Sequence, residues 1–186
     1  GASNGTTLTW TQAASTSGFG NLLDGSHRVL VGDFDGNGKS DVVMYYNGDG
    51  NWWLGASDGA HLAWQQAGSS AAAGNLADWS HRLFVGDYDG DGKSDVAAYD
   101  SDDGSFRVGR SDGTTLTWHA AGSVTGVGNL VEMDHLLYGG DYDGDGKSDF
   151  LSYGAGDGNW RVGRSDGTSF VWHVAGNTSG FGDLTR

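Results

Sequence analysis

The chain has 186 residues, of which 35 are Gly and none is Pro or Cys, and its formal net charge is −14. Without cysteine it has no disulfide scaffold, no thiolate-ligated metal site and no thiol nucleophile. No apolar run approaches the roughly 20 residues that a membrane-spanning helix requires. The composition therefore predicts one acidic, Gly-rich domain that does not insert into a membrane.

An internal repeat of 54 residues organises the chain. The decapeptide at residues 32–41 returns at 86–95, and the second copy recurs unchanged at 140–149. Three full units run over 4–57, 58–111 and 112–165, and a partial unit, 166–186, ends the chain. Self-similarity at a fixed period of this size is typical of repeat architectures, so residues 1–186 are interpreted as a single repeat domain.

Each unit is expected to contain four short strands. In chain order the first unit places them near 7–10, 27–31, 41–46 and 52–55, and the strand at 7–10 has its next copy at 61–64. These segments alternate in polarity and are separated by Gly-containing turns. Within residues 52–55 the period of two puts Trp52 and Leu54 in the interior and Trp53 at a rim or at the seam between blades.

Four-stranded antiparallel units that repeat along a chain are typical of a β-propeller, so the predicted fold class is all-β with three propeller blades. The strand type near 7–10 occurs four times and the other types three times, which leaves one extra terminal strand. Three blades do not readily close a ring. We expect closure by a second copy of the chain, most simply as a six-bladed homodimer, or by further residues of a longer protein.

The repeated decapeptide indicates a metal loop. Oxygen-bearing side chains occupy positions 1, 3, 5 and 9 from its first Asp, and Gly at positions 4 and 6 lets the chain wrap. Hard oxygen ligands at this spacing suit calcium, which takes six to eight oxygens at about 2.3–2.6 Å, and the Lys carbonyl at position 7 is a further predicted ligand. The predicted ligands are Asp33, Asp35, Asn37, Lys39 and Asp41; Asp87, Asp89, Asp91, Lys93 and Asp95; and Asp141, Asp143, Asp145, Lys147 and Asp149.

About three Ca²⁺ per chain are therefore expected. Asn37 stands where the other loops have Asp, which predicts weaker binding in the first loop, and the lysine ammonium groups are expected to point outward. The carboxylates of these loops contribute −11, against a net charge of −14, so the acidity is mostly an inventory of ligands. It also argues against binding to a nucleic-acid backbone.

The Asp-x-Asp-Gly-Asp/Asn-Gly-x-x-Asp loop, followed by an apolar strand, resembles the FG-GAP and VCBS repeats of integrin-α-like β-propellers. The Phe-Gly element stands at Phe19-Gly20 and Phe181-Gly182, becomes Val127-Gly128 in the third unit, and is lost at Ala73-Gly74. The resemblance implies structural calcium and a secreted, extracellular protein. The family includes adhesion receptors, lectins of the Psathyrella velutina type and accessory domains of secreted enzymes, and the fold alone does not select among these.

A carbohydrate-binding, lectin-like function with repeated weak sites is the first hypothesis, because aromatic faces stack on sugars and planar polar groups bind hydroxyls. The partner would be a glycan or a cell-surface glycoconjugate. The candidate ligand-binding residues are His27, His81 and His135; Asn21, Asn75 and Asn129; and Trp53, Arg107 and Arg161. The His and Asn sets are equally compatible with satisfying the backbone of the loops between blades, and the Arg residues with pairing to carboxylates.

Two other functions stay open. A protein-interaction or adhesion module would show a single asymmetric apolar patch instead of repeated sites, and a non-catalytic accessory domain would serve a larger secreted enzyme. Catalysis is not expected, because the chain has one Glu, Glu132, and no Ser-His-Asp order or His-rich metal site.

Overall fold

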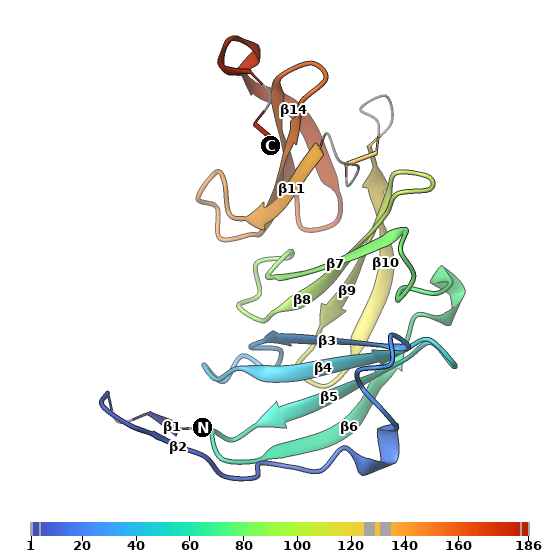
Figure 1. Ribbon diagram of the computed structural model, residues 1–186, viewed down its shortest axis with the longest axis vertical. Coiled ribbons are helices and arrows are strands. Elements are labelled where there is room, and N and C mark those ends of the chain that lie inside the picture. Colours follow the sequence, from blue (N-terminus) through green and yellow to red (C-terminus); the bar gives the residue numbers. More distant parts are fainter. Residues whose placement is uncertain (1, 4, 125–128, 131–134, 183, 186) are drawn as a thin grey trace.

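The computed structural model describes residues 2–3, 5–124, 129–130, 135–182 and 184–185. It contains three four-stranded antiparallel sheets and a two-stranded ribbon near the N-terminus (Figure 1). These sheets confirm the predicted all-β fold of propeller blades. The described residues include no helix with the length and apolar character needed to span a bilayer. Val127, Gly128 and Glu132, which entered the sequence argument, lie outside the described residues.

Each sheet, called a blade below, is a meander in which consecutive strands pair. Blade 1 consists of β3 (His27–Gly32), β4 (Asp41–Tyr46), β5 (Asn51–Ser57) and β6 (Leu62–Ser69). Blade 2 consists of β7 (His81–Gly86), β8 (Asp95–Asp100), β9 (Ser105–Ser111) and β10 (Leu116–Ser123). Blade 3 consists of β11 (His135–Gly140), β12 (Asp149–Gly154), β13 (Asn159–Ser165) and β14 (Phe170–Asn177). The ribbon is β1 (Ala2–Ser3) with β2 (Leu8–Thr9), and the 3₁₀ turns are η1 (Ser17–Phe19), η2 (Ala71–Ala73) and η3 (Ser179–Phe181).

The blades are offset from the repeats of the sequence. Strand β6 belongs to the second unit but pairs with β5, because a tight turn in which Asp58 N donates to His61 O at 3.1 Å joins the two strands. The first copy of this strand type, near residues 7–10, joins none of the three blades. Its Leu8–Thr9 segment pairs only with Ala2–Ser3, so it is the extra strand of the repeat pattern.

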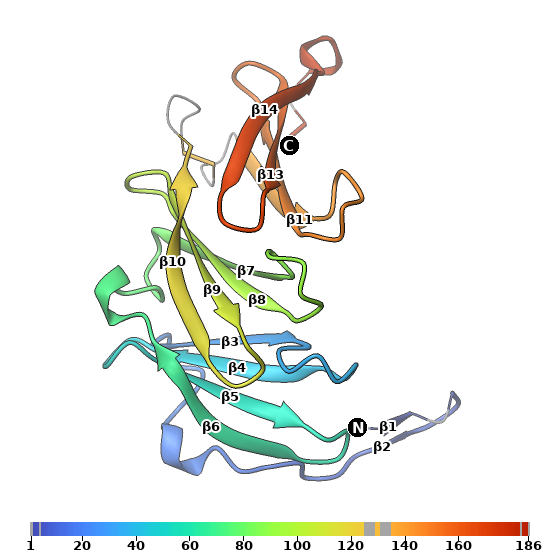
Figure 2. The same ribbon diagram turned by 180° about the vertical axis from the view of Figure 1, so that it is seen from behind.

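The blades lie beside one another in chain order, and the first strand of blade 2, β7, contacts β3 on one side and β11 on the other (Figures 1 and 2). The loops that join the first two strands of each blade lie on one side of the stack, the left in Figure 1. The connections from one blade to the next lie on the opposite side. The fold therefore separates the predicted metal loops from the predicted ligand residues at the starts of β3 and β7.

Apolar side chains fill the two spaces between blades. The cluster between blades 1 and 2 includes Phe34, Tyr45, Trp52, Leu54, Val96 and Leu116, and the cluster between blades 2 and 3 includes Tyr88, Tyr99, Phe106, Phe150 and Phe170. Trp52 and Leu54 are buried, as the alternation predicted. Full burial of a large apolar side chain contributes about 1.5–3 kcal/mol, so these clusters hold the blades together.

Three tryptophans pack directly onto glycines of the neighbouring strand. A Cβ at Gly109 would lie 2.6 Å from the ring of Trp118, and Gly163 stands in the same relation to Trp172 at 2.5 Å. The close approach of ring and backbone therefore requires Gly there. Trp10, the copy on the segment that joins no blade, is 78% exposed.

Candidate functional site

The loop between the first two strands of each blade gathers three carboxylates. In blade 2 they belong to Asp87, Asp89 and Asp95, and one oxygen from each lies within 4.8 Å of the others. The same grouping occurs in the other two loops, with Asp33, Asp35 and Asp41 in blade 1 and Asp141, Asp143 and Asp149 in blade 3. Clusters of hard oxygen donors at this spacing have the chemistry to hold a divalent cation.

Backbone amides shape each loop around its first Asp. In blade 2, Gly90 N donates to Asp87 Oδ1 at 2.7 Å, and Gly92 N donates to Asp87 Oδ2 at 2.8 Å. Gly90 and Gly92 have φ of +82° and +87°, a conformation that residues with a Cβ rarely adopt. The two glycines at positions 4 and 6 therefore let the loop wrap and turn its oxygens inward.

The last Asp of the loop is buried beneath the cluster. Asp95 is 0% exposed, and its carboxylate accepts hydrogen bonds from Tyr88 N at 3.0 Å and Ser111 N at 2.8 Å. Burial raises the pKa of Asp95 to about 7, and repulsion from Asp89 and Asp87 acts in the same direction. A divalent cation among the three carboxylates would offset both costs, so the donor set fits a bound calcium ion.

The remaining predicted ligands make other contacts. Asp91 and Asp145, at position 5, each accept a hydrogen bond at 2.7 Å from the ammonium of the Lys in their own loop. The ammonium groups of Lys93 and Lys147 thus turn back onto the loop instead of pointing outward. Asn37 Nδ2 donates to Asp35 Oδ2 at 2.7 Å. The carbonyl oxygens of Lys39, Lys93 and Lys147 stay predicted ligands.

Two arginines that sequence reasoning did not connect with the loops lie beside them. Arg110 Nε is 3.7 Å from Asp89 Oδ2, and Arg164 Nε is 3.5 Å from Asp143 Oδ2. The corresponding position of blade 1 is Ala56. Loop 1 therefore lacks the fourth carboxylate but also lacks the arginine, which offsets part of the weakness predicted from Asn37. Only the pairing of the strands brings the arginine to the loop.

A hollow of about 370 Å³ lies in blade 1, lined by residues from η1, from the start of β3 and from the end of β4. Its lining residues are Gly18, Phe19, Gly20, His27, Tyr46, Asp49 and Trp53. Two of the predicted ligand-binding residues of this unit, His27 and Trp53, are thus brought together. Asn21 does not line the hollow, and its Oδ1 accepts a hydrogen bond from Leu23 N at 3.1 Å.

Aromatic rings form the walls of the hollow. Trp53 packs against Phe19 with ring centroids 5.0 Å apart, and His27 stacks on Tyr46 at 4.7 Å. His27 is only 6% exposed, so it supports Tyr46 from beneath. Asp49 is exposed, and Asn51 N orients its carboxylate through a hydrogen bond of 2.9 Å to Oδ1.

Sequence reasoning missed Phe19, Tyr46 and Asp49 as lining residues. A search for repeated positions overlooks Tyr46, because the copies one and two periods later are Asp100 and Gly154. Asp49 does recur, as Asp103 and Asp157, and this recurrence could have identified it as a candidate ligand-binding residue.

The other blades carry ionic groups at the corresponding positions. His81 Nδ1 lies 2.7 Å from Asp78 Oδ1, Asn75 Oδ1 accepts from Ala77 N at 2.9 Å, and Arg161 pairs with Asp157. The contacts of Asn75 and Arg161 are those of the structural alternatives, a loop backbone N–H and a carboxylate, whereas His81 contacts a side-chain carboxylate instead of the loop backbone. Arg107 acts electrostatically to lower the pKa of Asp103, although hydrogen bonds from Ser105 are the main cause.

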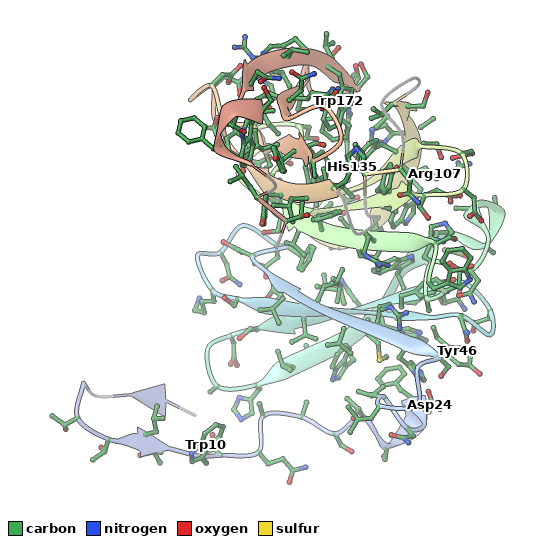
Figure 3. All side chains as sticks on the ribbon, turned by 45° about the horizontal axis from the view of Figure 1, so that its top comes forward. Trp10, Asp24, Tyr46, Arg107, His135 and Trp172 are labelled. Atoms are coloured by element: carbon green, nitrogen blue, oxygen red, sulfur yellow. The ribbon has the colours of Figure 1, made fainter. Side chains whose placement is uncertain are left out.

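In the third unit, the candidate His135 is the first residue of β11, and the candidate Asn129 precedes that strand in the chain. Figure 3 shows Tyr46, Asp24 and Arg107 along one side of the molecule and Trp10 far from them. The aromatic hollow described above belongs to blade 1.

Comparisons with known proteins identify the repeat. Residues 33–98, which include two of the three metal loops, match the model of the FG-GAP-like repeat. The chain is also similar to a solved structure of an Agrocybe aegerita lectin, described as recognising non-reducing terminal N-acetylglucosamine, with a TM-score of 0.69 and 22% identity. The similarity covers 87% of this chain and 41% of the lectin chain, so the chain spans about two-fifths of the length of that protein.

A comparison with curated protein sequences found no match. The repeat match covers the segment that carries the first two Asp loops, and the decapeptide at 86–95 recurs at 140–149. The similarity to the lectin extends over the described blades and concerns their fold. Residues 33–98 are therefore similar to the FG-GAP-like repeat, and the chain has the fold of β-propeller blades.

Proposed function

We propose that this chain is a calcium-stabilised, carbohydrate-binding β-propeller protein that acts outside the cell. The observation that carries the proposal is the blade 1 hollow, in which Trp53 and Tyr46 contribute aromatic rings next to the Asp49 carboxylate. A pyranose ring has C–H faces that pack on aromatic rings and hydroxyls that donate to a carboxylate. The lectin with a similar fold supports this choice of ligand class.

Calcium would act on the opposite side of the blade. The three Asp clusters would hold one ion each, and the ions would neutralise the loops without contacting the sugar. Millimolar calcium fills even modest sites, and this supports an extracellular setting. The ionic positions in blades 2 and 3, with Arg107 and Arg161 in place of Trp53, would bind a neutral sugar more weakly than blade 1.

A glycan array in millimolar calcium tests the proposal. We expect binding to glycans that Trp53→Ala reduces at least tenfold, because the substitution removes one wall of the hollow. The matched control is Trp79→Ala, which removes a tryptophan that is 78% exposed and does not line the hollow. If no glycan binds with or without calcium, the protein-interaction or accessory-domain alternative replaces the lectin.

A further inference from the structure

The stack of blades ends in two open faces, on the far sides of blade 1 and blade 3 (Figure 1). Equivalent residues one period apart show the difference between a covered and an open face. Phe34 and Tyr88 are 0% and 2% exposed beneath the next blade, whereas Tyr142 at the same position of blade 3 is 42% exposed. Leu76 and Leu184 differ in the same way, at 1% and 41%.

The open face of blade 1 carries the complementary surface. Leu83 and Val85 of blade 2 pack against the cluster shared with blade 1, but their equivalents Val29 and Val31 are 47% and 59% exposed. Each chain thus exposes, on blade 3 and on blade 1, the two surfaces whose equivalents pack together between blades 1 and 2 and between blades 2 and 3.

Polar contacts repeat between the blades with the same period. Ser94 N donates to Asp33 O at 2.7 Å, and Ser111 Oγ donates to Phe34 O at 2.6 Å. Between blades 2 and 3 the same two hydrogen bonds recur at 2.5 and 2.6 Å, from Ser148 N to Asp87 O and from Ser165 Oγ to Tyr88 O. The end faces carry the next members of the series, with Asp141 and Tyr142 on blade 3 and Ser40 and Ser57 on blade 1.

Glycines set the distance between blades. A Cβ at Gly32 would lie 2.8 Å from Ser94, and a Cβ at Gly86 would lie 2.5 Å from Ser148. Gly140 is the third member, and the atom nearest to a Cβ there, 3.4 Å away, belongs to Tyr142 of its own blade. The open face of blade 3 therefore keeps a glycine that its own fold does not require.

We propose that a second copy of this chain docks head to tail, with blade 3 of one copy on blade 1 of the other. In this contact Ser40 N donates to the Asp141 carbonyl, Ser57 Oγ donates to the Tyr142 carbonyl, and Tyr142 covers the apolar face around Val31. The contact is heterologous, so two copies satisfy all four end faces only by closing into a ring of six blades.

The N-terminal segment must be displaced from blade 1 in this assembly. Residues 4–24 repeat residues 166–186 at three periods, and part of this segment already lies on the open face of blade 1, where Leu62 N donates to Ala13 O at 3.2 Å. Phe19 packs there against Trp53 and Trp64, at centroid distances of 5.0 and 5.3 Å. Its equivalent Phe181 follows the eight-residue strand β14 and is 80% exposed.

The C-terminal segment of the docked copy would therefore replace the N-terminal segment of its partner. The N-terminal segment binds this face more weakly than the C-terminal segment would, because its strand β2 has two residues and its Trp10 is exposed. Phe181 of one copy would take the position of Phe19 beside Trp53. If the proposed sugar function holds, each hollow in the ring is then completed by the other copy, but the docking itself does not depend on that function.

Solution mass measured by light scattering over a range of concentrations tests the docking. We expect a species of twice the 19.4 kDa of one chain. Gly140→Val should shift this species to one chain, because its branched side chain would occupy the space of the second copy's Ser40. Thr117→Val, at an exposed position of β10, is the matched control and should leave the mass unchanged.

The phenylalanine pair gives a second readout with opposite signs. Phe181→Ser removes an interface ring and should weaken association at least tenfold, with little effect on the single chain. Phe19→Ser loosens the competing segment and should strengthen association. Circular dichroism of each variant establishes that the blades are folded. A mass of one chain at every concentration, or a dimer that Gly140→Val leaves intact, would overturn the proposal.

Discussion

Removal of calcium should destabilise the protein by an amount that the loop geometry sets. Two carboxylates 4.8 Å apart repel each other by about 3 kcal/mol at an effective dielectric constant of 20. Water reduces this repulsion, because the first two Asp residues of each loop are partly or fully exposed. A site filled at one hundred times its dissociation constant stabilises the fold by about 2.7 kcal/mol. We therefore expect a loss of about 2–3 kcal/mol for each emptied loop.

Thermal unfolding in millimolar calcium, compared with excess chelator, measures this loss. In a chain of this size about 1 kcal/mol shifts the melting temperature by 2–4 °C, so one emptied loop corresponds to roughly 5–10 °C. Asp89→Asn keeps the shape of the side chain but removes one charged ligand from loop 2, and it should remove about a third of the calcium-dependent shift. Asp102→Asn, an exposed position outside the metal loops, is the matched control.

An unchanged melting temperature after chelation would refute the reasoning. So would equal calcium responses in Asp89→Asn and Asp102→Asn, because the stabilisation would then be a general effect of ionic strength. Magnesium at the same concentration separates the two cases further. It prefers six ligands at a shorter distance and should stabilise the loops less than calcium.

Three further predictions concern stability in urea. Phe150→Ala should cost about 3–5 kcal/mol, because its ring is 0% exposed and packs between blades 2 and 3, and an unfolding midpoint close to that of the wild type would contradict this. Gly109→Ala should cost about 1–3 kcal/mol through the contact of 2.6 Å with Trp118, and an unchanged unfolding midpoint would contradict this. Hydrogen bonds from Thr115 and Thr114 hold the pKa of Asp112 well below its usual range, so its contribution is present above about pH 4 and is lost as pH falls through the lower folded pKa. Asp112→Asn should therefore cost about 1 kcal/mol at pH 7 and progressively less toward pH 2, and a cost independent of pH would count against the carboxylate.

The grouping of three Asp carboxylates in each loop was predictable from the sequence, whereas calcium ligation by the full predicted set stays a prediction. Asp87, Asp89 and Asp95 come together because ligand spacing within ten residues is a local property, and Gly90 and Gly92 fix the loop conformation without help from distant residues. The ion pair between Asp91 and Lys93 was not predicted from the sequence. The ammonium of Lys93 lies close enough to bond either this carboxylate or water, and the order of residues does not decide between them.

The candidate ligand hollow was predictable only in part. Trp53 and His27 were expected to contribute, but Phe19 of η1 and Tyr46 of β4 were not, because their approach to Trp53 depends on strand pairing and on the packing of η1. The assignment of Asn21 and Asn75 to the loop backbone also required the structure. Either role satisfies an amide side chain, and the position of the nearest backbone N–H decides.

The sequence by itself determined the 54-residue repeat, the all-β fold, the buried face of Trp52 and Leu54, and the oxygen-rich loops, since alternation and loop spacing are read along neighbouring residues. The tertiary structure decided that each blade takes its last strand from the next repeat, that Arg110 reaches Asp89, and that the segment around Ala13 lies beside β6 of blade 1 instead of forming a blade strand of its own. These are relations between segments tens of residues apart. Which segments pack together depends on how much apolar surface each arrangement removes from water. That buried area is defined only once the blades are packed.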